Sequence, residues 1–75
     1  MENRTIDKII FVVKDFLKLY QSQDDVVRSM LRISSWFRGE AFGYRQVLDS
    51  IKLNETISTE LRDEIVNLET ELNRI

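Results

Sequence analysis

The side chains that most often carry out chemistry in proteins are largely missing from this sequence. Histidine and cysteine are absent from its 75 residues, which removes the usual general base, the thiol nucleophile and the common zinc ligands. Glu60, Glu64 and Glu71 remain near the end of the chain. Their spacing is typical of a solvated helix face, and a di-iron site would also need histidine. We therefore expect no enzyme activity, no small-molecule substrate, no metal and no cofactor.

Four arginines could instead bind phosphate groups. Arg28 and Arg32 are four residues apart and share one side of a helix, while Arg38 and Arg45 share another. Nucleic-acid-binding proteins usually carry a basic surplus, whereas this chain has 11 basic and 13 acidic residues and a net charge of −2. A nucleic-acid-binding regulator that uses these arginines is therefore an alternative hypothesis.

The charges are distributed unevenly along the chain. Residues 1–52 hold nine Lys or Arg and seven Asp or Glu, a net of +2, whereas residues 53–75 hold two and six, a net of −4. The acidic segment is typical of a solvated helix face, and it also suits a basic partner. The candidate acidic partner surface consists of Glu60, Asp63, Glu64 and Glu71.

A ridge of small residues in the middle of the chain points to contact between helices. Ser35, Gly39 and Gly43 lie four residues apart. Two glycines inside a helix cost roughly 1 kcal/mol each relative to alanine, and the close approach of another helix would offset that cost. Alternatively, one glycine is only a kink or a helix end.

Large apolar side chains surround this ridge and lie off the main apolar stripe of the same predicted helix. Either the neighbouring helices wrap around this helix on several sides, or the side chains form an exposed patch that binds another molecule. The predicted intermolecular interface consists of Leu31, Ser35, Trp36, Gly39, Phe42 and Gly43.

Helical spacing accounts for the elements that must position these residues. The chain has no proline and only two glycines, and the turn signals of hairpins are missing. In the middle of the chain, apolar residues in phase predict one helix over residues 23–53, about 45 Å long at 1.5 Å per residue. A break at Gly39, or a bend at Gly39–Gly43, is the alternative. The predicted core stripe of this helix is Val26, Met30, Ile33, Phe37, Ala41, Tyr44, Leu48 and Ile51.

Shorter helices are predicted on either side, over residues 4–20 and 59–74. Between the first two helices, Ser22-Gln23-Asp24-Asp25 fits a capping box with Ser22 as the N-cap. Near the last helix, Ser58 or Thr56 can act as the N-cap.

The first predicted helix is apolar on more than one side. Phe11, Val12 and Leu19 lie partly outside its main stripe, although a helix that covers one neighbour needs a stripe only a little wider than 100°. The helix is therefore either central in the core or part of an intermolecular surface.

The sequence as a whole predicts an all-α protein. We expect a single domain over residues 1–75 with three antiparallel helices that run up, down and up, the middle one long. A chain of this length buries only about 60–65% of its unfolded surface, and without a disulfide or metal it is expected to need either very good helix packing or a partner subunit. We therefore expect a homo-oligomer, with a dimer favoured. No apolar run approaches the ~20 residues of a membrane span, so a cytoplasmic location is the default expectation.

The function predicted from these features is that of a small non-enzymatic interaction protein. It would regulate or inhibit a partner protein by contact, and short acidic helical proteins of this kind are common products of phages and other mobile elements. A structural subunit of a larger helical assembly is a further alternative.

Overall fold

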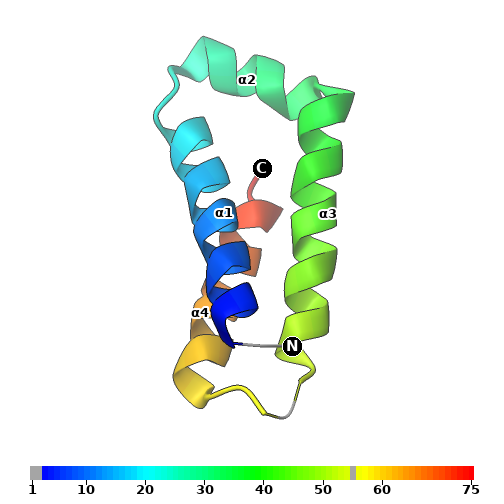
Figure 1. Ribbon diagram of the computed structural model, residues 1–75. Helices are drawn as coiled ribbons and strands as arrows, with labels where there is room; N and C mark the ends of the chain where they lie inside the picture. The colour runs from blue at the N-terminus through cyan, green and yellow to red at the C-terminus, as the bar shows by residue number, and fades with distance from the viewer. Residues whose placement is uncertain (1–2, 55) are drawn as a thin grey trace.

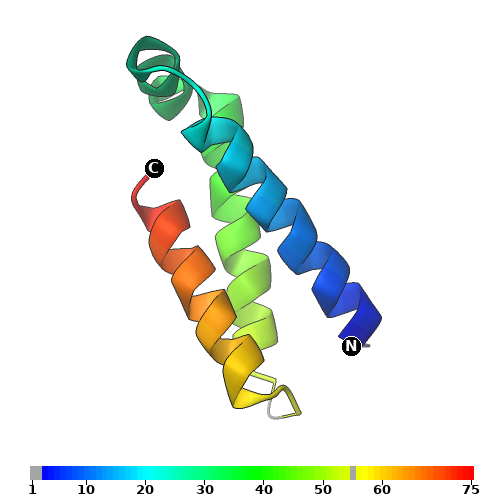
Figure 2. The ribbon, with the colours of Figure 1, turned by 90° about the vertical axis from the view of Figure 1, so that its left-hand side faces the viewer.

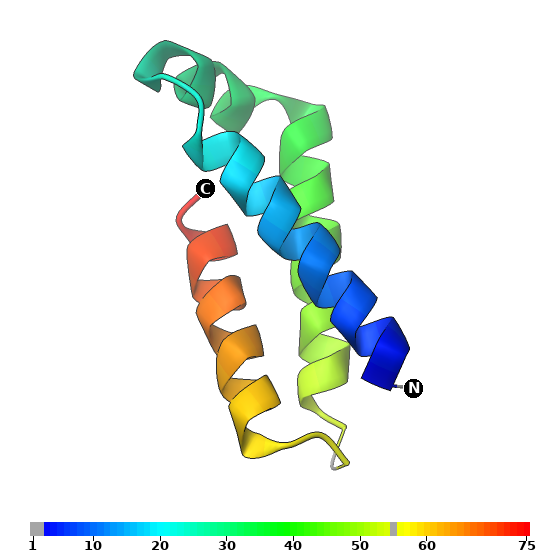
Figure 3. The same cartoon turned by 60° about the vertical axis from the view of Figure 1, so that its left-hand side comes forward.

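The computed structural model describes residues 3–54 and 56–75, and this part of the chain forms four helices. The first, third and last helices pack as a bundle that runs up, down and up, and the short second helix lies across one end of this bundle (Figures 1 and 3). The helices are α1 (Asn3–Gln21), α2 (Asp25–Ile33), α3 (Ser35–Lys52) and α4 (Thr59–Asn73). The all-α prediction is confirmed, and the first and last predicted helices match α1 and α4 to within one residue at each end.

The predicted single helix over residues 23–53 is wrong, because the chain leaves helical geometry at Ser34. The backbone of Ser34 is extended, with φ −75° and ψ 124°. Its N–H donates to the carbonyl of Leu31 at 3.0 Å, and its Oγ accepts from the N–H of Phe37 at 3.4 Å. Ser34 therefore ends α2 and caps α3, in keeping with the way serine competes for backbone hydrogen bonds. A break at Gly39 is also wrong, since α3 continues through both glycines.

The break turns the apolar stripe of α2 away from the core. Val26, Met30 and Ile33 were predicted to be buried, but they are 70%, 62% and 80% exposed. α2 contacts the bundle through its other side, where Val27 and Leu31 are half-buried and Leu31 packs against the core. The second half of the predicted stripe lies on α3 and does face the core. Its buried members are Phe37, Ala41, Leu48 and Ile51.

An aromatic cluster joins α1 to the first half of α3. The rings of Phe16 and Phe37 stack with centroids 4.7 Å apart, and Tyr20 stacks on Phe37 at 5.3 Å. Tyr44 meets Phe16 edge-on at 5.0 Å. Each such pair contributes about 0.5–1.5 kcal/mol beyond the burial of its surface. The rest of the core is aliphatic, and its fully buried members are Ile6, Val13, Leu48, Ile65 and Leu72.

The helix caps agree with the sequence at α4 and differ from it at α2. Of the two predicted candidates, Ser58 and Thr56, it is Ser58 that caps α4, since its Oγ accepts from the N–H of Leu61 at 3.1 Å. The N-cap of α2 is Asp24, whose Oδ1 accepts from the N–H of Val27 at 2.9 Å. Ser22 is not the cap, because its hydroxyl donates to the last turn of α1 at 2.8 Å. The predicted N-cap of this helix was therefore two residues too early in the sequence.

The bundle is elongated, with principal extents of 41 × 20 × 18 Å. α2 closes the end where α1 stops and α3 begins (Figures 1 and 2). At the other end, Lys52 on α3 bridges to α4, with its Nζ 3.1 Å from Oε1 of Glu69. Hydrogen bonds to the carboxylates of Glu69 and then Asp49 raise the pKa of Lys52. Within the described residues, no helix combines the length and the apolar character needed to cross a membrane.

Candidate interaction surface

Large apolar side chains remain exposed on every helix, and three helices expose three each. All of these side chains are at least 40% exposed. Scattered apolar side chains are normal on protein surfaces, but groups of them mark interaction sites. They are Phe11, Val12 and Leu19 on α1, Val26, Met30 and Ile33 on α2, Trp36, Phe42 and Val47 on α3, and Val66 on α4.

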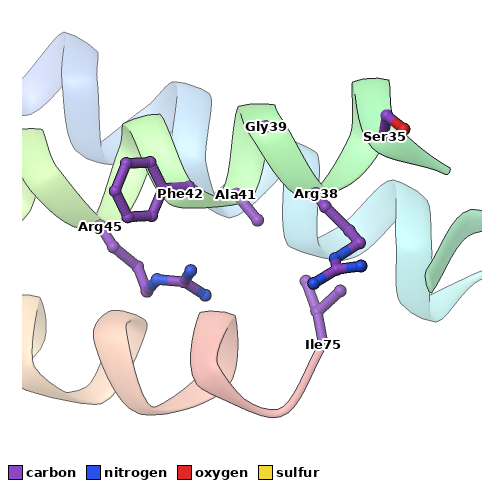
Figure 4. A pocket seen from close by; sticks show the side chains of 7 residues that line it. All are labelled: Ser35, Arg38, Gly39, Ala41, Phe42, Arg45 and Ile75. Atoms are coloured by element: carbon purple, nitrogen blue, oxygen red, sulfur yellow. The ribbon is translucent and has the colours of Figure 1, made fainter. Parts of the chain in front are cut away.

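A hollow of about 530 Å³ opens between α3 and the end of the chain (Figure 4). Ala41 is buried, and the ring of Phe42 is 53% exposed. The guanidinium groups of Arg38 and Arg45 both extend from α3 toward Ile75. The hollow therefore combines apolar walls with two cations. Its lining residues are Ser35, Arg38, Gly39, Ala41, Phe42, Arg45 and Ile75.

The structure brings together only part of the predicted interface. Ser35, Gly39 and Phe42 line the hollow. Trp36 is 67% exposed, but it is six residues from Phe42 and therefore points about 120° away around the helix axis. Leu31 was placed in the same patch on the assumption of an unbroken helix. It lies instead on the inner side of α2, which removes it from the exposed surface.

The two glycines of α3 face open space. A Cβ added at Gly39 or Gly43 would meet no neighbouring atom within 4 Å. No helix of the described chain therefore approaches the ridge closely, and nothing within this part of the molecule offsets the helix-weakening effect of the glycines. The predicted close approach would have to come from another molecule.

The predicted acidic partner surface is divided by contacts between α1 and α4. Glu64 forms an ion pair with Lys14, and Glu71 accepts a hydrogen bond of 2.7 Å from Nε2 of Gln21. Both acids therefore make contacts with α1. Only Glu60 and Asp63 remain exposed and free of such a contact in the described structure.

Arg28 is occupied by the connection between α1 and α2. Its Nη1 donates to the carbonyls of Gln21 at 3.3 Å and Gln23 at 2.8 Å, and its Nη2 forms an ion pair with Asp25. A guanidinium that closes a turn in this way is unavailable for phosphate contacts unless the turn rearranges.

The other three arginines do not form one basic surface either. Arg45 donates to the carbonyl of Leu72 at 3.4 Å, and its guanidinium lies 5.8 Å from the ring centroid of Phe42. Arg32 lies on α2 and donates to Oγ of Ser29. Arg38 borders the hollow. The nucleic-acid alternative therefore retains two exposed arginines on different helices, Arg32 and Arg38.

An apolar groove between α1 and α3 was not predicted. It has a volume of about 250 Å³. Burial of Tyr44 beside this groove raises the pKa of its hydroxyl, and the charge of Glu40 raises it further. Val12 and Val47 could have indicated this groove from the sequence, because each lies off the main apolar stripe of its helix. The groove is lined by Thr5, Lys8, Ile9, Val12, Tyr44 and Val47.

The described residues contain no group of three or more side chains placed to hold a metal ion. Comparison with protein-family models, with curated proteins and with solved structures finds no match to this chain. Its function is therefore argued from its own side chains.

Proposed function

We propose that this chain is a small non-enzymatic protein that binds a partner protein and regulates or inhibits it by covering part of its surface. The observation that carries the proposal is the exposed ring of Phe42 beside a hollow bordered by Arg38 and Arg45. Aromatic and arginine side chains are enriched at the energetic centres of protein interfaces.

The chemistry of the hollow specifies the kind of partner segment that suits it. An apolar side chain of the partner would pack against Phe42 and Ile75. A neighbouring carboxylate would pair with Arg38, whose guanidinium makes no hydrogen bond or ion pair within the described residues. The open space at Gly39 allows a partner backbone to come close to α3. The expected ligand is therefore an apolar segment that contains Asp or Glu.

A second contact would use the opposite charge. Glu60 and Asp63 on α4 are exposed, so a basic region of the partner would suit this side of the molecule. Surface ion pairs contribute at most about 1 kcal/mol each, and we therefore assign orientation to this acidic surface and most of the affinity to the hollow.

Affinity capture with matched phenylalanine variants tests the proposal. Phe42 on α3 and Phe11 on α1 are both exposed, at 53% and 71%. We expect the wild-type chain and Phe11→Glu to retain the same protein in a fixed ratio, and Phe42→Glu to lose it while its helical circular dichroism is unchanged. The proposal is wrong if Phe42→Glu retains every protein that the wild type captures, or if the wild type captures none.

The nucleic-acid alternative has its own test. Fluorescence anisotropy with labelled DNA at low salt would show tight, salt-sensitive binding if phosphate contacts dominate. If that binding is lost in an Arg32→Ala, Arg38→Ala double variant, nucleic-acid binding through these arginines replaces the protein-partner proposal. The remaining alternative, a subunit of an extended helical assembly, predicts a mass that keeps rising with concentration and does not level off at a discrete oligomer.

A further inference from the structure

The outer face of α2 is an apolar stripe that nothing in the described chain covers. Val26, Met30 and Ile33 are spaced four and three residues apart, so they lie on one side of the helix. They are 70%, 62% and 80% exposed. α2 lies across the end of the 41 Å bundle (Figure 2), and its other side packs on that bundle. The stripe therefore faces away from the molecule.

Charges on α2 are arranged so that the face complements itself. Asp25 lies in the first turn and Arg32 in the last turn. Because they are seven residues apart, both lie on the same flank of the apolar stripe. A second copy placed antiparallel would bring Asp25 of each chain to Arg32 of the other, whereas in a parallel copy the same flank of each helix would lie on opposite sides of the interface and neither charge would meet its opposite. Antiparallel pairing also opposes the two helix dipoles favourably.

We propose that two copies of this chain dimerise through the outer faces of their α2 helices, antiparallel about a two-fold axis near Met30. Val26 of each copy then packs against Ile33 of the other, and the two Met30 side chains meet on the axis. Asp25 already pairs with Arg28, but its side chain is 93% exposed and its carboxylate has lone pairs for a second cation. An interface in which one patch meets itself is the usual form of a two-fold dimer.

The size of the face sets the expected strength of the dimer. Stable interfaces bury about 800 Å² on each partner, which is more than the outer face of one nine-residue helix provides. We therefore expect a dissociation constant in the micromolar range. The proposed dimer uses none of the residues that line the hollow on α3, so either proposal can fail without the other.

Mass as a function of concentration tests the dimer. Sedimentation equilibrium from about 1 µM to about 1 mM spans the expected range of dissociation constants. The wild-type chain should pass from 8.9 kDa to twice that mass, and Ile33→Glu should remain a monomer. Phe11→Glu, which alters an exposed apolar side chain on α1, should behave as the wild type. A wild type that stays monomeric, or an Ile33→Glu variant that dimerises normally, would overturn the proposal.

Charge reversal tests the antiparallel arrangement. Asp25→Arg and Arg32→Asp should each weaken the homodimer about tenfold or more, because each places like charges together twice. The double variant with both changes in one chain should recover most of the affinity, since every pair is again of opposite sign. Circular dichroism of each variant reports whether α2 stays folded. Single variants that dimerise as tightly as the wild type, or a double variant with no recovery, would exclude this pairing.

The shape of the dimer provides a separate check. Pairing through α2 joins two molecules at their ends, so small-angle scattering should give a particle much longer than the 41 Å monomer. A dimer that is wider but no longer than the monomer would contradict the proposal and indicate side-by-side pairing, such as pairing through Gly39 and Gly43.

Discussion

α2 and α3 are neighbours in the sequence and carry one apolar pattern, yet the pattern is exposed on the first helix and buried on the second. Ile33 on α2 is 80% exposed, whereas Ile51 on α3 is 3% exposed. A single extended residue, Ser34, separates the helices. The difference shows that helical periodicity identifies an apolar face but does not determine which neighbour covers it.

The physical reason is the change in direction at Ser34. In an unbroken helix, residues at intervals of three and four keep one orientation. An extended residue rotates the following helix relative to the preceding one, so the two parts of the stripe no longer point the same way. α2 then lies across the end of the bundle and buries Val27 and Leu31 partly. α2 covers the bundle at that end, and the original stripe of α2 is left exposed.

Truncating an isoleucine on each side of the break gives the largest expected effect. Ile51→Ala should lower the free energy of unfolding by about 2–4 kcal/mol, because it leaves a cavity in the core. Ile33→Ala should change it by less than about 0.5 kcal/mol in the monomer. Urea denaturation at a concentration below that of any dimer would measure both. Equal losses would mean that the outer face of α2 is buried in solution.

The next largest effect is expected from a comparison of the two candidate N-caps of α2, Asp24 and Ser22. Asp24→Ala should cost about 1 kcal/mol, because Asp24 caps α2. Ser22→Ala should cost less, since the hydroxyl of Ser22 only donates to a carbonyl of α1. Because α2 forms little of the core, much of the Asp24→Ala loss should appear as fraying of α2, which amide hydrogen exchange would resolve. A larger effect of Ser22→Ala would restore Ser22 as the cap.

Alanine in place of a glycine should stabilise α3. Gly43→Ala should raise the free energy of unfolding by about 0.5–1 kcal/mol, because alanine favours the helix and its Cβ meets no neighbour within 4 Å. Thermal denaturation would measure the gain, with Gly39→Ala as a parallel case. A destabilised variant would reveal a close contact at the ridge.

Proline at the first position of α3 tests the break itself. Ser35 follows an extended residue and begins a helix, which is where proline is accepted. Ser35→Pro should therefore change stability by less than about 1 kcal/mol, whereas proline inside a continuous helix costs about 3 kcal/mol. A loss near the larger value in thermal denaturation would indicate an unbroken helix in solution.

The smallest expected effect is a loss of stability at alkaline pH, caused by ionisation of Tyr44 on α3. The pKa of Tyr44 is raised above its usual value of 10.0 by burial and by Glu40. The neutral phenol is thus favoured in the folded state, so its contribution is complete below pH 10 and declines as the pH rises through the folded pKa. Tyr44→Phe should show a shallower fall in melting temperature above pH 10. An unchanged slope would mean that other groups cause the fall.

Parts of the candidate surface were predictable because they depend on local pattern. Phe42 was identified from its position off the apolar stripe, Ser35 and Gly39 from their spacing of four residues, and all three line one hollow in the structure. The roles of Glu64 and Glu71 were not predictable, because their partners Lys14 and Gln21 are each 50 residues away in the sequence. Arg38 was noted as a phosphate-binding candidate, whereas its place beside Ile75 emerged only from the packing of α4.

By itself, the sequence determined the helical class, the extents of α1 and α4, and two candidates for the N-cap of α4, Ser58 and Thr56. These follow from the 3.6-residue period and from hydrogen bonds between residues a few positions apart. Only the tertiary structure decided that the middle stretch breaks at Ser34 and that Val26, Met30 and Ile33 face outward. The helical preferences of ordinary residues differ by well under 1 kcal/mol, so contacts between distant segments determine whether a serine continues a helix or ends it.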